Sequence, residues 1–505
     1  MAHTFRRCGL SSLLILLGLF ACQTQPPAPP AAAVPKIFNI ETFGAVPDGK
    51  TPATLAIQKA LDACGAAGGG QVIVPAGTFF TAPLSLRSGV DLHLEAGALL
   101  TFSKDHKDYP LILSSYEGKE TYICQPPIWG QNLTNVSITG PGAIDGQGQT
   151  WRTVKRSKLT DQQWNDLVAS GGVTDDDQTQ WWPSDTSRTD LRKLFAIRAK
   201  SGPPNIEDYR PLRDLLRPNL ILLADCTHVL LQDATFRNSG SWDIHLLDSS
   251  DIAVRHITVH NELWAQNGDG IDVDSCANVL IENSTINAGD DDICLKSGRD
   301  EAGRLHARPT QHVIVRNCEI GWGHGGIAIG SETSGGIRDV DVYNCTLTGT
   351  DIPIRFKTVR GRGGVVEDIH IHNIAISKVT NTCILFDMYY QEKNPKPEPV
   401  SVRTPIFRDI TIRDVICYSG KRAINVRGLP ELPMNNITLE NVRLNCDGGA
   451  SFSDGRDFVL RNVSITSRTA PALETYNIAN LTLDHVDAVV QAAGTPQASA
   501  KETAP

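Results

Sequence analysis

Aromatic residues, methionine and basic charge are all scarce in this chain of 505 residues. Aromatic side chains make up 6% of the sequence, and only 3 residues are methionine. Lys and Arg number 47 against 56 Asp and Glu, so the formal net charge is −9. A nucleic-acid-binding protein normally carries a basic excess, so this balance argues against nucleic acid as a partner. A polyanionic ligand would have to meet a local group of cations.

A long hydrophobic run is also missing. The apolar stretch at residues 13–20 is too short to cross a bilayer as a helix. Two arginines precede it and Cys22 follows, so residues 1–22 are typical of a signal peptide with a bacterial lipobox. We therefore expect export to the bacterial cell envelope, with a lipid on Cys22 as the only membrane anchor at the outer membrane. Plain secretion is the alternative.

Metal-binding cysteine motifs are absent, because no CxxC occurs. The chain has 12 cysteines, of which Cys8 and Cys22 belong to the signal, so 12 − 2 leaves 10. An exported protein can form disulfides, but their pairing cannot be deduced from the sequence. Stacked core thiols and bridges therefore both remain open, and we expect neither a metal nor a cofactor.

Two low-complexity segments border the body of the chain. Residues 23–35 are rich in Pro and Ala, as in a tether, and residues 491–505 form a polar tail. We expect one domain over 36–490, in a monomer. Residues 147–218 interrupt its repeat, contain four tryptophans and are otherwise polar. This long insertion either lies beside a groove or is a solvated loop.

A sequence motif recurs along the chain. It has the form apolar-x-apolar, followed by a polar turn and a second short strand. Val229, Ile252 and Val279 begin three successive copies, 23 and 27 residues apart. One such unit cannot bury its apolar side alone, so the units must stack, at about 4.8 Å per coil. The pattern predicts an all-β fold, a single right-handed parallel β-helix. A leucine-rich repeat shares the period, but its usual helical segment is absent.

Two further patterns support the β-helix. An Asn stands four residues after the first apolar position in six copies, where it suits a left-handed turn and can bond to its neighbours along the axis. These residues are Asn283, Asn317, Asn344, Asn373, Asn441 and Asn462. Residues 51–64 have an apolar stripe at helical spacing, so we expect a helix that covers the N-terminal end of the core.

Four polar clusters lie about one coil apart. They are Asn267-Gly268-Asp269, Gly289-Asp290-Asp291, Gly323-His324-Gly325 and Arg355-Phe356-Lys357. Their spacing predicts one patch on one face of the solenoid. Two cations on the same strand face suit a substrate carboxylate, and crowded carboxyl groups can divide into an acid and a base, as glycosidic cleavage requires. Calcium-binding or solvated carboxylates, a structural His and an ordinary charged edge are the alternatives.

These clusters resemble the signature of glycoside hydrolase family 28, the polygalacturonases. The stretches FGAVPDGKT, GGGQVIVPAGTF and GPGAIDGQG are similar to the family's N-terminal region. The resemblance implies an inverting hydrolase of α-1,4-linked galacturonan, with pectic polysaccharide as its partner. The sequence departs from the family pattern at Gly268 and at Asp292, which stands where many members have Cys.

The resemblance also implies roles for individual residues. Asp290 would be the general acid, Asp269 and Asp291 would hold and activate the water, and His324 would tune the acid. The substrate-binding residues would be Arg355, Lys357 and Asn267, with Tyr389 or Tyr390 as a face for sugar stacking. The roles of Asp272, Asp274 and Asp292 are expected to be structural or electrostatic.

The mode of action is indicated less directly. The stretches SETSGG and RGRGGVVED resemble bacterial exo-type members, and the insertion could close one end of the groove, so we favour exo over endo action. A calcium-dependent pectate lyase and a non-catalytic, glycan-binding surface lipoprotein are the competing hypotheses.

Overall fold

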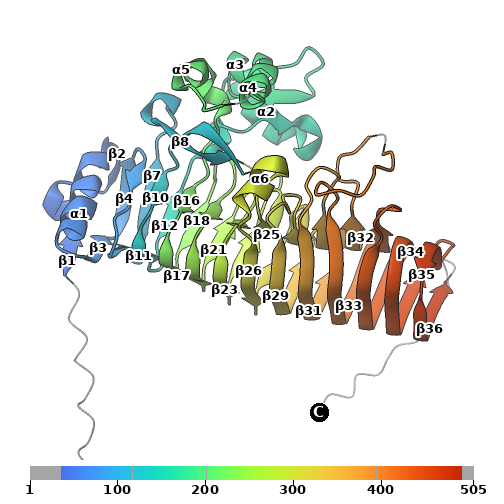
Figure 1. The fold of residues 1–505 in the computed structure, drawn as a ribbon. Helices are drawn as coiled ribbons and strands as arrows, with labels where there is room; N and C mark the ends of the chain where they lie inside the picture. The colour runs from blue at the N-terminus through green and yellow to red at the C-terminus, as the bar shows by residue number, and fades with distance from the viewer. Residues whose placement is uncertain (1–35, 117, 201, 394, 492–505) are drawn as a thin grey trace, which may run out of the picture. The chain divides into compact units, whose positions relative to one another are not determined.

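The computed structural model describes residues 36–491 except 117, 201 and 394. Within them, one parallel sheet of 31 strands winds into a right-handed β-helix, and each strand pairs with its counterpart on the next coil (Figure 1). The predicted fold is therefore confirmed. The predictions for residues 1–22, Cys22 and residues 23–35, and for the tail beyond Gln491, lie outside the described residues.

The coils have three sides. The first side carries the polar clusters, and we call it the site sheet; it comprises β10 (Ile128–Gln131), β16 (Ile221–Ala224), β19 (Ile244–Leu247), β22 (Ile271–Asp274), β25 (Asp291–Lys296), β28 (Gly325–Ile329), β30 (Ile352–Lys357) and β32 (Val379–Asp387). The second side comprises β11 (Thr134–Thr139), β17 (Thr227–Gln232), β20 (Ser250–Arg255), β23 (Ala277–Glu282), β26 (Thr310–Arg316), β29 (Ile337–Thr348) and β31 (Val365–Ser377). The third comprises β12 (Ala143–Asp145), β18 (Thr235–Arg237), β21 (Thr258–His260), β24 (Thr285–Asn287) and β27 (Glu319–Ile320).

The first and last coils complete the solenoid. The N-terminal strands are β1 (Ile37–Asn39), β2 (Asp48–Pro52), β3 (Gly70–Val74), β4 (Gly77–Thr81), β5 (Leu84–Ser85), β6 (Val90–Leu94) and β7 (Ala98–Phe102). The C-terminal strands are β33 (Ile406–Arg427), β34 (Met434–Ser467), β35 (Leu473–Ala479) and β36 (Thr482–Val490). Several of these late strands run through the corners of a coil, so one strand contributes to more than one side.

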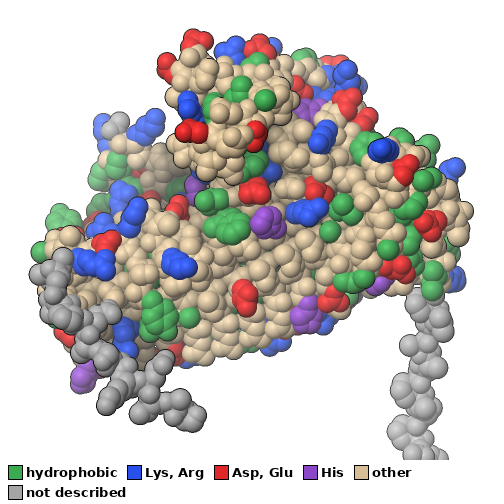
Figure 2. All heavy atoms as spheres, turned by 180° about the vertical axis from the view of Figure 1, so that it is seen from behind, with side chains coloured by type: hydrophobic (Ala, Val, Ile, Leu, Met, Phe, Trp, Pro, Cys, Tyr) green, Lys and Arg blue, Asp and Glu red, His purple; other side chains and the backbone are tan. Residues whose placement is uncertain are grey.

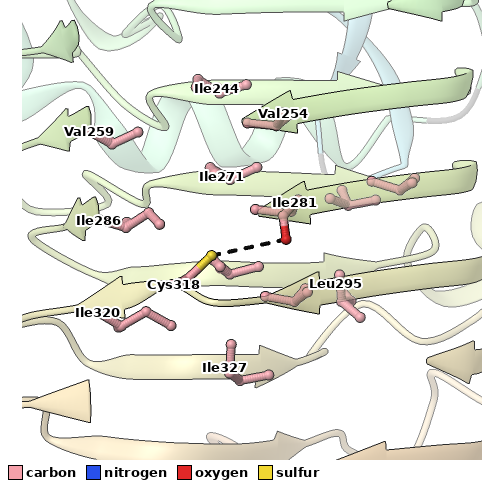
Figure 3. Close-up of a cluster of buried hydrophobic side chains, with 14 of the residues drawn as sticks. Ile244, Val254, Val259, Ile271, Ile281, Ile286, Leu295, Cys318, Ile320 and Ile327 are labelled. Atoms are coloured by element: carbon pink, nitrogen blue, oxygen red, sulfur yellow. Dashed lines mark hydrogen bonds between the residues drawn. The ribbon is translucent and has the colours of Figure 1, made fainter. Parts of the chain in front are cut away.

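The core is a column of stacked apolar side chains. Each coil of the site sheet contributes one isoleucine at the same register position; the column consists of Ile128, Ile221, Ile244, Ile271, Ile293, Ile327, Ile354, Ile384 and Ile424. All of them are buried. Figure 3 shows that Val254 and Ile281 of the second side and Val259 and Ile286 of the third side point toward the same interior. The repeat therefore produces one continuous core, as the spacing predicted.

Helix α1 (Thr54–Ala66) covers the N-terminal end of this core, and it packs on β1, β3, β5 and β6. Its buried residues include Ile57, Leu61 and Cys64, so the predicted apolar stripe is confirmed. The predicted start at residue 51 was wrong. Strand β2 pairs with β4 as far as Pro52, and this pairing holds Thr51 and Pro52 in extended backbone, so the helix begins at Thr54.

The predicted asparagine ladder is present on the outer corner of the coils. The Nδ2 atom of Asn344 donates to Oδ1 of Asn317 at 3.3 Å, and Oδ1 of Asn344 accepts from Nδ2 of Asn373 at 3.2 Å. Asn344 has φ 55°, in the left-handed region. Each Asn therefore serves both the backbone turn and the bonds between coils.

Replacing Asn344 with Ala should lower the free energy of unfolding by about 1–3 kcal/mol, because Ala resists the left-handed turn and both amide bonds are lost. Asn344→Gly accepts the turn and loses only the bonds, so it should be less destabilised. Denaturant unfolding of both variants measures the difference. Equal losses in the two variants would contradict a role for the backbone conformation.

All ten cysteines in the described part of the chain are buried and unbridged. Several stack on one another between coils, and the Sγ atoms of Cys383 and Cys417 lie 2.6 Å apart. Of the two possibilities that the sequence left open, the structure has the stacked thiols.

The insertion is a folded unit on the edge of the site sheet (Figure 1). It contains α2 (Asp161–Ala169), α3 (Asp185–Thr189), α4 (Leu191–Arg198), α5 (Ile206–Tyr209) and a small sheet of β13 (Val154–Lys155), β14 (Val173–Thr174) and β15 (Gln180–Trp182). Trp164 and Trp181 form one apolar cluster with Val154, and Trp151 lies in a second. It is therefore not a solvated loop. The hairpin of β8 (Leu111–Tyr116) and β9 (Lys119–Cys124) lies next to it.

Charges of both signs are interspersed over the coils on the face that Figure 2 shows. None of the helices in the described residues is long and apolar enough to cross a membrane.

Candidate active site

The site begins where the strands of the site sheet start. Strand β25 begins at Asp291, so Asp290 belongs to the preceding turn and the two neighbouring carboxyl groups are aimed differently. The turn is tight at Gly289, where a Cβ atom would lie 2.3 Å from the carbonyl oxygen of Ala265. A side chain at this position would clash with that oxygen, so only glycine fits there.

Asp269 and Asp291 lie on adjacent coils and converge on one point. Their carboxylate oxygens and the sulfur of Cys294 all lie within 4.8 Å of one another, and all three residues are buried. One oxygen of Asp269, Oδ1, has no hydrogen-bond partner among the described residues although it is inaccessible. A buried, unpartnered oxygen of this kind is available to a bound water molecule.

Asp291 is held by the two cations that the sequence singled out. Nη1 of Arg355 lies 3.0 Å from its Oδ1, and Nζ of Lys357 donates to its Oδ2. Burial alone would raise the pKa of Asp291, but these cations outweigh burial and lower it well below its usual value. Asp291 is therefore ionised throughout the ordinary pH range.

The pKa of Asp269 is shifted in the opposite direction. Burial raises the pKa of Asp269 well above its usual value, and the neighbouring Asp272 and Asp290 raise it further. The crowded carboxyl groups that the sequence predicted therefore differ in their pKa, because the two cations contact Asp291 and do not contact Asp269.

His324 lies beside Asp290, the more accessible member of the three aspartates. Nδ1 of His324 is 3.8 Å from Oδ1 of Asp290, and its Nε2 is 4.0 Å from Oδ2 of Asp351. The backbone N–H of His324 also donates to the carbonyl oxygen of Asp290 at 2.8 Å. The imidazole is therefore placed to act on Asp290.

The predicted substrate-binding residues fall into two groups. Tyr390 lies beside the cations, with its ring centre 5.2 Å from Nζ of Lys357 and 5.7 Å from Cζ of Arg355. Tyr389 instead packs against Arg360 and Arg427, at 5.0 Å and 4.8 Å. The structure thus brings only Tyr390 to the candidate site.

Asn267 has an unexpected partner. Its Oδ1 accepts a hydrogen bond from Nη2 of Arg217 at 2.8 Å. Arg217 comes from the end of the insertion, and it was not among the predicted site residues because the insertion has no repeat that could predict its position. It adds a further cation near Asp269 and Asp290.

A buried ion-pair network lies beside the three aspartates. Nζ of Lys296 is 3.4 Å from Oδ1 of Asp272 and 3.2 Å from Oε2 of Glu332. Burial raises the pKa of Asp272 to about 8 even with Lys296 beside it. Oδ1 of Asp292 accepts the backbone N–H of Ala288 at 2.9 Å.

Asp269, Asp291 and Cys294 could together offer three ligands to a metal ion. The chemistry of the site disfavours this, because Arg355 and Lys357 already neutralise Asp291 and would repel a cation. The arrangement suits acid–base chemistry better than metal binding.

A cavity of about 970 Å³ adjoins the candidate site. The insertion lines one side of it with Trp151, Trp182 and Phe195, and Arg217 and Asn267 line the side toward the aspartates. The insertion therefore encloses space next to the site, together with later residues such as Asp300 and Gln391.

Comparisons with known proteins agree with this architecture. A model of "Glycosyl hydrolases family 28" matches residues 213–467, and one of "Rhamnogalacturonase A/epimerase, pectate lyase-like" matches residues 37–164. A "Probable polygalacturonase" of Vitis vinifera is 31% identical over 420 residues, which cover 80% of this chain and 74% of that protein.

Two bacterial proteins are also similar. The "Exo-poly-alpha-D-galacturonosidase" of Dickeya chrysanthemi is 28% identical, over 86% of this chain and 72% of that protein. The crystal structure of an exopolygalacturonase from Thermotoga maritima superposes with a TM-score of 0.69 at 26% identity, covering 89% of this chain and 92% of that one. The family model covers half of the chain and the residues of the candidate site, so the chain belongs to glycosyl hydrolases family 28 and is a glycoside hydrolase.

Proposed function

We propose that this enzyme hydrolyses α-1,4-galacturonosidic bonds in pectic polysaccharide, with inversion. One observation carries the proposal: consecutive coils bring Asp269, Asp290 and Asp291 together beside Arg355 and Lys357. Three carboxyl groups supply the acid and the base, and the cations select an acidic sugar. The names of the polygalacturonase relatives support the same substrate.

Each carboxyl group has its own task in this proposal. Asp290, which is accessible and next to His324, protonates the glycosidic oxygen of the leaving sugar. Asp291 stays ionised through its two cations and takes the proton of the attacking water, which Oδ1 of Asp269 helps to hold. Inversion requires room for this water between the acid and the base, which are about 6.5–9.5 Å apart in such enzymes.

The cations also bind the substrate carboxylate. Nε of Arg355 is buried and has no hydrogen-bond partner in the described part of the chain, so it can still donate to a ligand. Tyr390 offers a ring face next to Arg355 and Lys357, where a sugar can pack. Asn267 is held by Arg217 at the opposite side, toward the cavity.

We also propose exo action. The cavity beside the aspartates is bounded by the insertion and can take the terminal part of a chain, whereas an endo-acting enzyme needs a groove open at both ends. The exo-acting relatives support this assignment. The enzyme acts after export, as a monomer, with the lipid on Cys22 as its membrane anchor.

Digestion of polygalacturonate with a metal chelator present tests the proposal. Reducing sugar should accumulate without a rise in ultraviolet absorbance, because hydrolysis leaves no unsaturated uronate. The product released in the first minutes should be small and uniform, because cleavage starts from chain ends. Chromatography of the products over time measures their size.

Three outcomes would contradict the proposal in different ways. An absorbing product whose formation stops with chelator would indicate a calcium-dependent pectate lyase. Binding of the polysaccharide without cleavage would indicate a non-catalytic glycan-binding protein. A ladder of product sizes from the start would retain hydrolysis and refute exo action.

A further inference from the structure

A second hollow, of about 300 Å³, lies on the same side of the solenoid as the candidate site. Its lining includes Arg360, Tyr389, Arg427, Ser453, Asp454 and Tyr476. The strand register connects it with the site, because Lys357, Asp387, Arg427, Ser453 and Tyr476 occupy one position on five successive coils. At about 4.8 Å per coil, the hollow begins about 10 Å beyond Lys357 and reaches about 19 Å.

A short segment joins this hollow to the catalytic region. Tyr389 lines the hollow, Tyr390 lies beside Lys357, and Gln391 lines the large cavity. This segment therefore joins the hollow to the large cavity beside the cations. A polymer whose end occupies the cavity can continue along this segment into the hollow.

The charges in the hollow differ from those at the site. Arg360 pairs with Glu431 at 2.6 Å and with Glu392 at 3.1 Å, and Arg427 pairs with Asp387 at 3.3 Å. Both guanidinium groups that line the hollow are thus already paired with carboxylates around it, and Asp454 adds a carboxylate to the lining itself. Neither of these two cations is left unpaired for a free uronate.

The aromatic groups favour a sugar without charge. The guanidinium groups of Arg360 and Arg427 pack on the ring of Tyr389, which fixes it. Tyr476, by contrast, is 74% exposed and presents its ring to solvent at the far end of the register column. An exposed ring next to paired charges is suited to the apolar face of a pyranose.

We propose that this hollow is a distal subsite for an uncharged pyranose of the departing polymer. The sugar is either a methyl-esterified galacturonate or a neutral backbone sugar, which share the absence of a charged carboxylate. The inference rests on the proposed function, because the polymer must first be held at the cations. It makes the enzyme sensitive to the identity of the sugars beyond the cleaved bond.

Kinetics of Tyr476→Ala on three polymers test the subsite. The polymers are de-esterified polygalacturonate, partly methyl-esterified polygalacturonate and a rhamnogalacturonan. We expect kcat/KM to fall about 3- to 10-fold on one or both polymers that contain uncharged sugars, and less than about twofold on the de-esterified polymer. Loss on the esterified polymer identifies the ester, and loss on rhamnogalacturonan identifies the neutral sugar.

Two variants serve as controls. Tyr476→Phe keeps the ring and should behave as the wild type. Tyr418→Ala removes a tyrosine that is 59% exposed but lies outside the hollow, and it should have no effect on any polymer. An equal loss on all three polymers, or no loss on any, would overturn the subsite. Wild-type enzyme that fails to cleave the de-esterified polymer would instead refute the proposed function.

Discussion

Asp290→Asn should lower kcat on polygalacturonate by about 10²–10⁴-fold, because the amide cannot protonate the departing glycosidic oxygen. The substrate should still bind, since the cations and Tyr390 are unchanged, so KM should move much less than kcat. Steady-state kinetics on the polymer measure both quantities. Because Asp290 is partly exposed and pairs only loosely with His324, the variant should fold normally.

A matched substitution separates the loss of the acid from the loss of charge. Asp368→Asn removes an exposed carboxylate at a left-handed turn, where Asn is equally suited, and it should leave kcat unchanged. Unfolding temperatures of both variants should equal that of the wild type. Asp290→Asn with kcat within a few fold of the wild type would exclude Asp290 as the general acid.

Lys357→Met should give the second large effect, on the pH dependence of kcat/KM. Lys357 and Arg355 hold the pKa of Asp291 well below its usual value, against the effect of burial. Without Lys357 the burial is less compensated, so this pKa rises and the base becomes protonated at a higher pH. The variant should therefore lose activity as the pH falls through the acidic range, where Asp291 of the wild type remains ionised.

The same substitution should also weaken substrate binding. Removing one partner of a buried charge pair and one contact to the substrate carboxylate should lower kcat/KM by about 30- to 1,000-fold even near neutral pH. Lys421→Met, at an exposed lysine elsewhere on the solenoid, should change neither the rate nor the profile. A lower kcat/KM with an unshifted acidic limb would mean that Asp291 is not the base.

The sequence predicted the parts of the site that depend on the repeat. The spacing of the apolar positions required stacked coils, and stacking brings Asp269, Asp291 and Arg355 onto nearby coils whatever the details of the loops. The asparagine ladder followed for the same reason. These features are periodic, so a single sequence is sufficient to predict them.

Other features depend on contacts that have no period. Arg217 reaches Asn267 from the insertion, and the direction of that segment is set by its own apolar clusters. Tyr389 and Tyr390 are adjacent in sequence, but only the structure decides which of them lies beside Lys357. The start of α1 moved to Thr54 because β2 uses the preceding residues.

The difference in pKa between the carboxyl groups was predicted from the sequence only in part. The sequence predicted that crowding would divide the aspartates into acid and base, and crowding is indeed present. Which carboxyl group becomes ionised depends on where the cations reach, and both Arg355 and Lys357 reach Asp291. Side-chain reach of this kind cannot be read from the spacing of motifs.

The isoleucine column of the site sheet has a consequence for how the binding surface can change. Backbone hydrogen bonds between coils fix the axial distance from one coil to the next, so the length of the binding surface can change only in steps of one whole coil. Adding or deleting one coil after Ile424 would lengthen or shorten the surface along which the polymer lies by the height of one coil. The positions of Asp290 and its neighbours would stay the same, because each coil contacts only the coils directly before and after it.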